Sequence, residues 1–125
     1  MTLVLDAGAL MRIERGDPLL ARLVSRERRA TRRPRTHGGV VGQVWRGGAR
    51  QARLAHAMRG IEVVPLDEDL GRRAGTLLAR STTNDVIDAA VALIAGDGDD
   101  ILTSDPDDLL PLLLLTGTEA RVVAI

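Results

Sequence analysis

Short apolar runs bounded by polar residues recur along the chain, and each of them predicts a buried strand. The runs are TLVLDAG at 2–8, IEVVPL at 61–66, DDILTSD at 99–105 and ARVVAI at 120–125. The segment RRPRTHGG at 32–39 predicts a loop with room for one more short strand.

Longer amphipathic stretches fill the intervals between these runs and predict helices. Residues 9–29 predict two helices that break at Gly16, with Asp17 as N-cap and Pro18 at the first position of the second helix. Further helices are expected at 40–60 with an interruption at Gly47 and Gly48, at 67–81, at 83–98 with Thr83 or Asn84 as cap, and at 106–115. Strands that alternate with helices predict one three-layer α/β domain over residues 1–125, with a mostly parallel sheet.

The composition limits what the chain can be. At 125 residues and 45% hydrophobic content, the chain is long and apolar enough for a buried core, although Trp45 is its only aromatic side chain. It has no Cys, which excludes disulfides and thiolate metal sites. The start lacks the layout of a signal peptide, and the apolar stretch at 109–115 contains a proline and is too short to cross a bilayer. We therefore expect a soluble cytoplasmic protein with no membrane partner.

Opposite charges are sorted along the chain, although the net charge is zero. Residues 22–59 carry eleven Arg against one acid, Glu27, whereas residues 84–108 carry eight Asp and no basic residue. All 17 basic residues are Arg. Two interpretations are open: a polyanionic partner beside a cation-binding site, or two ordinary solvated surfaces.

Two carboxylates occupy the positions where a parallel sheet usually carries its functional site, beyond the carboxyl ends of strands. Asp6 follows the first strand, and its side chain either caps the next helix or serves as a metal ligand or general base. Asp105 ends the segment 99–105, directly after Thr103 and Ser104, where the predicted strand ends, and is assigned to the site.

Asp85 and Asp88 are three residues apart on a predicted helix and therefore project from nearly the same face. Asp85 is explained equally well as a charge at the helix start. Asp88 lies within the apolar segment VIDAAV, where an unpaired carboxylate is unfavourable, and with no Lys in the chain its partner must be an Arg or a metal.

The remaining acids of this region are assigned to other roles, namely Asp97, Asp99 and Asp100 to a solvated turn, and Asp107 and Asp108 to the first turn of a helix. Three or four carboxylates from separate segments at one sheet edge would form an oxygen site suited to Mg²⁺ or Mn²⁺. A shared cation would also relieve their mutual repulsion.

Four segments, in this order and at these separations, resemble the PIN domain, and in particular the Arg-rich VapC-type toxins of bacterial toxin–antitoxin pairs. The segments are TLVLDAGAL, VVGQVWRGG, DVIDAAVALIA and LTSDPDDLL. The resemblance implies a sheet with strand order 3-2-1-4-5 and helices on both faces. It also implies a Mg²⁺-dependent ribonuclease that cuts single-stranded or looped RNA, such as tRNA or rRNA.

By position, the first, third and fourth acids of the family fall on Asp6, Asp88 and Asp105, which the resemblance makes metal ligands. A bound Mg²⁺ neutralises a phosphate, orients the attacking water and stabilises the departing oxygen. The family's second acid, a Glu, falls on Gln43, which has no charge and cannot act as a base. Either Asp85 supplies the missing charge, which we favour, or the chain is a weakened or inactive relative that binds metal, RNA or an antitoxin without cleavage.

Arginines are the candidate contacts for RNA phosphates. The segment 22–35 contains seven of them, and the candidates are Arg28, Arg29, Arg32 and Arg33, together with Arg46 and Ser104 close to the expected site. With a single aromatic residue, we expect backbone contacts rather than base stacking. The alternative is a solvated Arg-rich helix and loop. His37 and His56 are assigned to packing or the surface.

The resemblance further implies a VapB-like antitoxin that binds a groove formed by the early helices, whose apolar stripe we expect near the entrance of the site, and a homodimer. Two other acidic α/β classes, receiver domains and phosphatases with an Asp nucleophile, both use a Lys, which this chain lacks. The remaining alternative to an enzyme is a binding module on the same fold.

Overall fold

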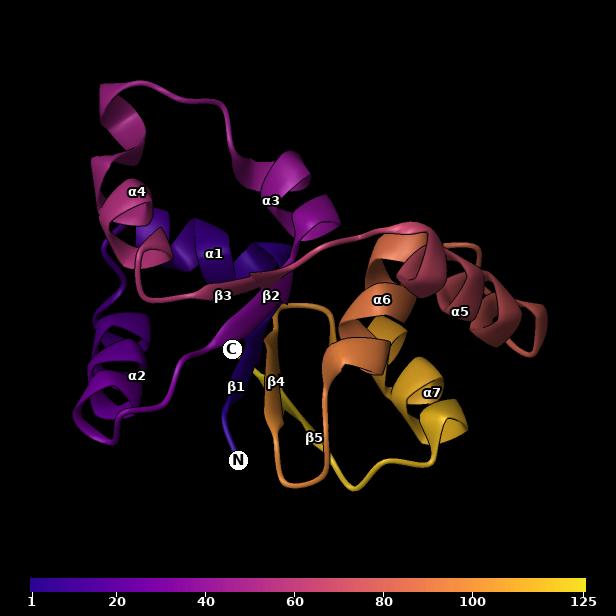
Figure 1. Cartoon of the computed structure of the whole chain (residues 1–125). Helices are drawn as coiled ribbons and strands as arrows, with labels where there is room; N and C mark the ends of the chain where they lie inside the picture. Colours follow the sequence, from indigo (N-terminus) through magenta and orange to yellow (C-terminus); the bar gives the residue numbers. More distant parts are fainter.

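The computed structural model describes all residues from 1 to 125, and the chain forms five short strands, seven α-helices and one 3₁₀ turn (Figure 1). The strands are β1 (Leu3–Leu5), β2 (Arg35–His37), β3 (Glu62–Val64), β4 (Asp100–Thr103) and β5 (Arg121–Ala124). The helices are α1 (Ala7–Glu14), α2 (Pro18–Arg29), α3 (Gly38–Val44), α4 (Ala52–Met58), α5 (Glu68–Ala79), α6 (Val86–Ile94) and α7 (Pro106–Thr116), and the 3₁₀ turn η1 is Ala49–Gln51.

All strand pairs are parallel, and the order across the sheet is β3-β2-β1-β4-β5. This order confirms the expected 3-2-1-4-5 arrangement, and the weak strand candidate within 32–39 is β2. Because every strand runs in the same direction, the chain crosses a face of the sheet between successive strands. The carboxyl ends of β1 and β4 consequently lie side by side, with Leu5 opposite Leu102.

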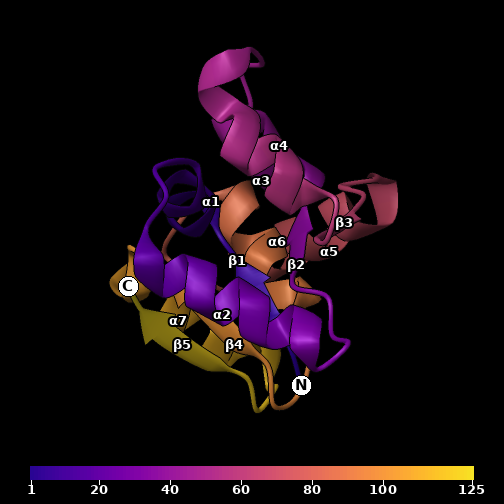
Figure 2. The ribbon, with the colours of Figure 1, turned by 90° about the vertical axis from the view of Figure 1, so that its left-hand side faces the viewer.

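Helices cover both faces of the sheet, which gives the three-layer arrangement. Helices α1, α2 and α4 lie on one side of the sheet, and α5, α6 and α7 on the other (Figures 1 and 2). The central strand β1 is completely enclosed, because Val4 and Leu5 have no exposed surface. The hydrophobic core consists of aliphatic side chains, because the only Trp of the chain is exposed and Phe and Tyr are absent. None of the helices is both long and apolar enough for a membrane span.

The helix boundaries follow local capping chemistry. Asp17 caps α2, and its Oδ1 accepts hydrogen bonds from the N–H groups of Leu19 (2.8 Å) and Leu20 (3.3 Å), as the sequence predicts. Helix α6 begins later than expected: its N-cap is Asp85 rather than Thr83 or Asn84. The reason is that Thr83 accepts a hydrogen bond from the N–H of Asp85 (3.4 Å) and so belongs to the preceding turn.

Two of the three acids assigned to a solvated turn, Asp99 and Asp100, have structural roles, which corrects that assignment for them. Asp99 is 4% exposed, and its two carboxylate oxygens accept hydrogen bonds from the N–H groups of Thr2 (2.8 Å) and Gly96 (2.8 Å). Asp100 forms a two-point ion pair with Arg121, at 2.9 and 3.1 Å. Only Asp97 of this group is exposed. These acids lie where the strands begin, at the edge opposite Asp6.

Candidate functional site

A cavity of about 450 Å³ opens at the carboxyl edge of the sheet, where the amino ends of α1, α6 and α7 meet the side of α3. Its polar lining consists of Asp6, Gln43, Arg46, Asp85, Asp88, Asp105 and Asp108. All four carboxylates that the sequence assigns to the site are in this set. The acids of residues 84–108 thus lie at two edges of the sheet. Asp99 and Asp100 are structural at one edge, and Asp85, Asp88, Asp105 and Asp108 line the cavity at the other.

Asp6 is held firmly at the tip of β1. It is 6% exposed, and its Oδ1 accepts a hydrogen bond from the N–H of Ala9 (2.9 Å) as the N-cap of α1. Burial raises the pKa of Asp6, and the nearby Asp105 adds to this, while hydrogen bonds from Thr103 and Ala9 act in the opposite direction. Asp6 is therefore both a helix cap and a cavity residue, so the two roles that its sequence position allows do not exclude each other.

Close packing beside Asp6 depends on Gly8. A Cβ atom at this position would lie only 2.2 Å from Oγ of Ser104 and 3.4 Å from Oδ1 of Asp6. The helix start at α1 and the loop after β4 can approach each other only because this residue has no side chain. Ser104, a candidate phosphate contact, is exposed at this junction.

Asp88 carries the strongest electrostatic perturbation in the cavity. It is half-buried on the first turn of α6, and burial raises the pKa of Asp88 to about 7, with further contributions from the charges of Asp85, Asp108 and Asp6. Asp85 is exposed, and its Oδ1 accepts a hydrogen bond from the N–H of Asp88 (3.1 Å). Asp88 is the more enclosed of the two, which favours it as an inner ligand.

The start of α7 contributes two carboxylates. Asp105 is the N-cap by position, but its side chain makes no capping hydrogen bond, so the carboxylate is free to face the cavity. Asp108 also lines the cavity, and sequence reasoning missed it by assigning it only to the helix dipole. The available signal was the spacing of three residues from Asp105, which places both side chains on one helix face.

None of these carboxylates is neutralised by an arginine. The nine ion pairs of the structure involve other acids, and no Arg nitrogen lies within 4.0 Å of a carboxylate oxygen of the cavity. Arg46 lines the cavity, yet its guanidinium donates to the carbonyl oxygens of Gly42 (3.1 Å) and Trp45 (2.7 Å). No arginine is therefore paired with Asp88 in this structure.

The donor set fits a hard divalent cation by chemistry, since it consists of Asp carboxylates and the Gln43 amide oxygen. As placed, no three acidic or histidine side chains are grouped closely enough to hold one ion between them. Asp105 has no side-chain hydrogen bond to break when it turns inward. Gln43 is exposed on α3 and lines the same cavity as the carboxylates.

The arginines of the segment 22–35 lie away from this cavity. The carbonyl oxygen of Arg33 accepts a hydrogen bond from the Thr2 hydroxyl (2.9 Å), which fixes the loop after α2 at the edge where the strands begin. Arg32 is bonded to the buried Glu27 at 2.6 Å. The candidates Arg28, Arg29, Arg32 and Arg33 therefore cannot contact the same phosphate as the carboxylates, and any RNA contact they make is remote.

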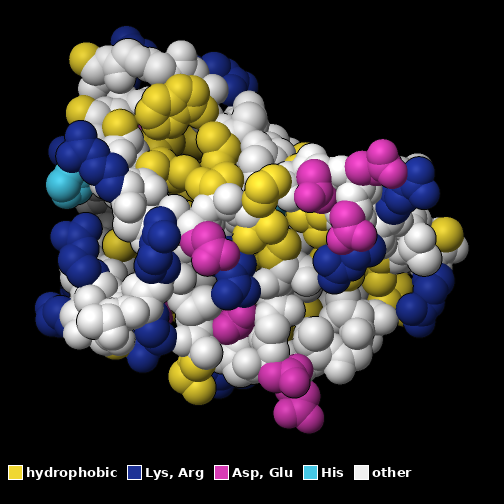
Figure 3. Space-filling view, viewed as in Figure 1, with side chains coloured by type: hydrophobic (Ala, Val, Ile, Leu, Met, Phe, Trp, Pro, Cys, Tyr) yellow, Lys and Arg dark blue, Asp and Glu magenta, His cyan; other side chains and the backbone are white.

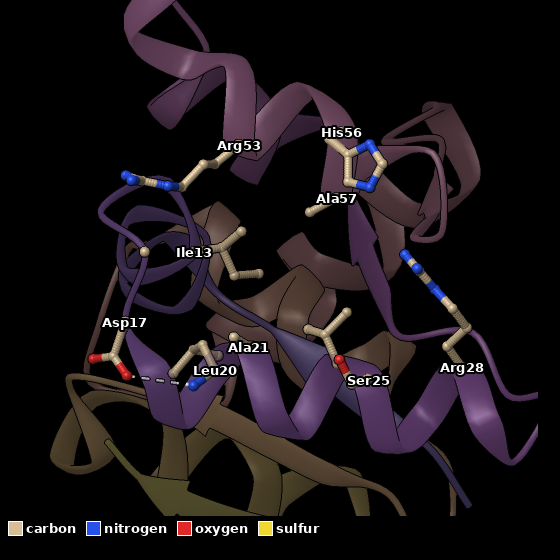
Figure 4. Close-up of a pocket in the computed structure, with 11 residues that line it drawn as sticks. Ile13, Asp17, Leu20, Ala21, Ser25, Arg28, Arg53, His56 and Ala57 are labelled. Atoms are coloured by element: carbon tan, nitrogen blue, oxygen red, sulfur yellow. Dashed lines mark hydrogen bonds between the residues drawn. The ribbon is translucent and has the colours of Figure 1, made fainter.

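A second cavity, of about 270 Å³, lies between α1, α2 and α4 (Figure 4). Its floor includes Ile13 and Leu20, and Arg28, Arg53 and His56 lie around its rim. The apolar stripe of the early helices thus lines a groove at the carboxyl end of α1, whereas the acidic cavity is at its amino end. On the face shown in Figure 3, hydrophobic side chains gather between α3 and α4, and arginines follow the side of α2 and α4.

Two buried polar residues support the site without having a recognisable signal in the sequence. His37 has no exposed surface; its Nδ1 accepts from the N–H of Gly39 (3.0 Å), its Nε2 bonds to the carbonyl oxygen of Ile87 (2.9 Å), and burial lowers the pKa of the ring. It thereby links α3 to the first turn of α6 in a packing role. Gln51 is 6% exposed and supports the loop after α3.

Comparison of the sequence with models of known protein families finds no match, and comparison with curated proteins finds none either.

Proposed function

We propose that the protein is a Mg²⁺-dependent endoribonuclease that hydrolyses phosphodiester bonds in single-stranded or looped RNA, with Mn²⁺ able to substitute. The observation that carries the proposal is a set of five Asp side chains around one cavity with no arginine partner. Because burial and like charge already raise the pKa of Asp88, the set favours a proton or a cation as its missing partner. An oxygen-only donor set suits hard cations such as Mg²⁺, Mn²⁺ and Ca²⁺, and the resemblance favours Mg²⁺ among them.

Each residue has a distinct part in the proposed chemistry. Asp6, Asp88 and Asp105 would hold the cation, and Asp85 or Asp108 would accept a proton from the attacking water. Gln43 would contribute a neutral oxygen at the opposite wall. When bound, the cation supplies charge neutralisation at the phosphate and at the departing oxygen.

A second function rests on Gln43, the one position that departs from the resemblance. A cavity with this amide in place of a carboxylate could bind metal, RNA or a protein partner without cleavage. Asp108 weakens this alternative, because it adds a carboxylate that the sequence argument did not count. The two functions differ in one observable, namely metal-dependent cleavage.

The partners and the setting of this function follow from the resemblance and are part of the proposal. The protein would act in the cytoplasm as the toxin of a toxin–antitoxin pair and as a homodimer, with tRNA or rRNA as substrate class. Support for a VapB-like antitoxin comes from the groove between α1, α2 and α4, whose apolar floor and arginine rim suit an amphipathic acidic segment.

The test is cleavage of mixed total RNA by purified protein, with Mg²⁺, with Mn²⁺ and with a chelator. Asp6→Asn should lower the cleavage rate by at least about 100-fold, the scale of removing one group that stabilises transition-state charge. Asp107→Asn is the matched control, because it removes the charge of an Asp at the start of α7, between Asp105 and Asp108, that does not line the cavity. Cleavage that persists in the chelator, or that Asp6→Asn leaves unchanged, would contradict the proposal.

Mg²⁺ titration followed by thermal unfolding separates binding from chemistry. Stabilisation by Mg²⁺ that is lost in Asp6→Asn, together with no cleavage by the wild type, would favour the binding module. If Mg²⁺ does not stabilise the wild type and the wild type does not cleave RNA, the metal site itself is rejected.

A further inference from the structure

The single tryptophan of the chain belongs to the segment of α3 and the following loop that forms one wall of the acidic cavity. Trp45 is the C-cap residue of α3; Gln43, two residues before it, and Arg46, directly after it, line the cavity, whereas Trp45 itself does not. Trp45 is 42% exposed, although the chain contains no Phe and no Tyr that could take its place in the core. The largest apolar side chain of the protein thus keeps a substantial part of its surface in water, and that part contributes nothing to the buried core.

The loop that carries this ring is fixed by one buried amide. Oε1 of Gln51 accepts hydrogen bonds from the N–H groups of Arg46 (2.8 Å) and Gly47 (2.9 Å), and its Nε2 donates to the carbonyl oxygen of Val44 (2.9 Å). The N–H of Trp45 donates to the carbonyl oxygen of Val41 at 2.8 Å. The backbone on both sides of the ring is therefore anchored, and the exposed indole is carried on a fixed segment of the chain.

A positive charge is held beside the ring in the same way. The guanidinium of Arg46 donates to the carbonyl oxygens of Gly42 and Trp45, and it makes no ion pair with any carboxylate. Its charge is consequently available to an anion at the cavity mouth. An exposed aromatic face next to an unpaired guanidinium matches the two parts of a nucleotide, a base that stacks and a phosphate that is negative.

We propose that Trp45 stacks on an unpaired base of the RNA that flanks the scissile phosphate, and that Arg46 contacts the adjoining phosphate. This inference rests on the proposed ribonuclease function and narrows its substrate to RNA whose nucleotide beside the cleavage position is unpaired. One aromatic side chain is enough for this role, since it orders a single nucleotide while the carboxylate site acts on its neighbour. Trp45 is then a specificity-determining residue rather than a catalytic one.

The experiment uses the intrinsic fluorescence of the protein, because Trp45 is its only tryptophan and it has no tyrosine. The Asp6→Asn variant is titrated with a ten-nucleotide unpaired RNA, with the same strand carrying abasic positions, and with the corresponding duplex. The unpaired strand should quench the emission, whereas the abasic strand and the duplex should quench it far less. Binding by the Trp45 variants is followed instead through the anisotropy of the same RNA carrying a fluorescent label, because these variants lack the tryptophan signal. Trp45→Leu, which keeps an apolar side chain without an aromatic face, should weaken binding of the unpaired strand by roughly 5- to 100-fold, and Trp45→Phe should restore most of it.

Cleavage by the corresponding variants in the wild-type background separates this inference from the function on which it rests. Metal-dependent cleavage without quenching, and unchanged in Trp45→Leu, would overturn the stacking role and leave the ribonuclease intact. Quenching without cleavage would keep the stacking role and reject the enzyme. Emission that shifts with protein concentration in the absence of RNA would place Trp45 between two copies of the chain and overturn the inference.

Discussion

Replacing Asp88 with Asn should stabilise the metal-free protein at pH 8. Burial and the neighbouring acids raise the pKa of Asp88 from 3.8 to about 7, so the folded chain binds this proton more tightly than the unfolded chain. The free energy of unfolding therefore falls as the pH rises from about 4 to about 7, where Asp88 ionises in the folded state. Below about pH 4 the carboxyl is protonated in both states and imposes no penalty.

The magnitude follows from the size of the shift. A rise from 3.8 to about 7 corresponds to at most about 4 kcal/mol at 1.36 kcal/mol per pKa unit. Asp88 is only half-buried, so solvent screening reduces this to about 1–2 kcal/mol. Asn also loses the attraction of a carboxylate to the start of α6, about 0.3–1 kcal/mol, which leaves a net gain of about 1 kcal/mol.

Urea unfolding between pH 4.5 and pH 8 in a chelator measures this difference. Asp88→Asn should unfold at a higher urea concentration than the wild type at pH 8 and at nearly the same concentration at pH 4.5, and Asp107→Asn should follow the wild type. Part of the pH dependence should remain in Asp88→Asn, because the pKa of Asp6 is also raised. Added Mg²⁺ should stabilise the wild type more than the variant. A variant less stable than the wild type at pH 8 in chelator would refute the electrostatic argument.

Three further substitutions test the surroundings of the cavity. Gln43→Glu should raise Mg²⁺ affinity in a calorimetric titration, by about tenfold for one added carboxylate ligand worth about 1.4 kcal/mol, and should raise cleavage; unchanged affinity would place Gln43 outside the metal site. Gly8→Ala should lower the free energy of unfolding in urea by about 1–3 kcal/mol, because its Cβ would lie 2.2 Å from Oγ of Ser104. Adding Ser104→Gly should recover part of this loss, and no recovery would show that the loss has a cause other than this contact. Gln51→Leu should lower stability by about 2–4 kcal/mol, since it leaves two N–H groups and a carbonyl oxygen unpaired, whereas a loss below about 0.5 kcal/mol would show that the loop is not held by this amide.

The order of strands and helices could be predicted because it depends on local patterns. The apolar run at β1 and the breaks at Gly16 and at Gly47–Gly48 are properties of neighbouring residues, and the structure confirms them. The strand order came from the resemblance, because periodicity alone does not determine which strands are adjacent. The convergence of Asp6 and Asp105 then followed from the rule that parallel strands end at one edge.

The errors concern residues whose environment is set by distant parts of the chain. Asp99 is buried because the pairing of β1 with β4 brings the N–H of Thr2 to its carboxylate, across 97 positions of sequence. Asp108 shares a local preference with Asp107, and only the packing of α7 decides which of the two faces the cavity. The buried amide of Gln51 has no local signal at all, because η1 returns the chain to the end of α3 only after the two glycines.

The position of β1 in the middle of the sheet also determines when the cavity can exist during folding. β1 pairs with β2 about thirty residues later, at Val4 and Arg35, and with β4 almost a hundred residues later, at Leu3 and Asp100. Contacts of such long sequence separation form late, because the intervening chain must first lose its freedom. Asp6 comes from the early part of this sheet and Asp105 from the late part, so a chain with only β1, β2 and β3 assembled has one of the five cavity acids, Asp6, and lacks the other four. Cation binding during refolding would therefore report the docking of β4 against β1. A nascent chain would complete the acidic cavity only after β4 has paired with β1, almost a hundred residues away in the sequence.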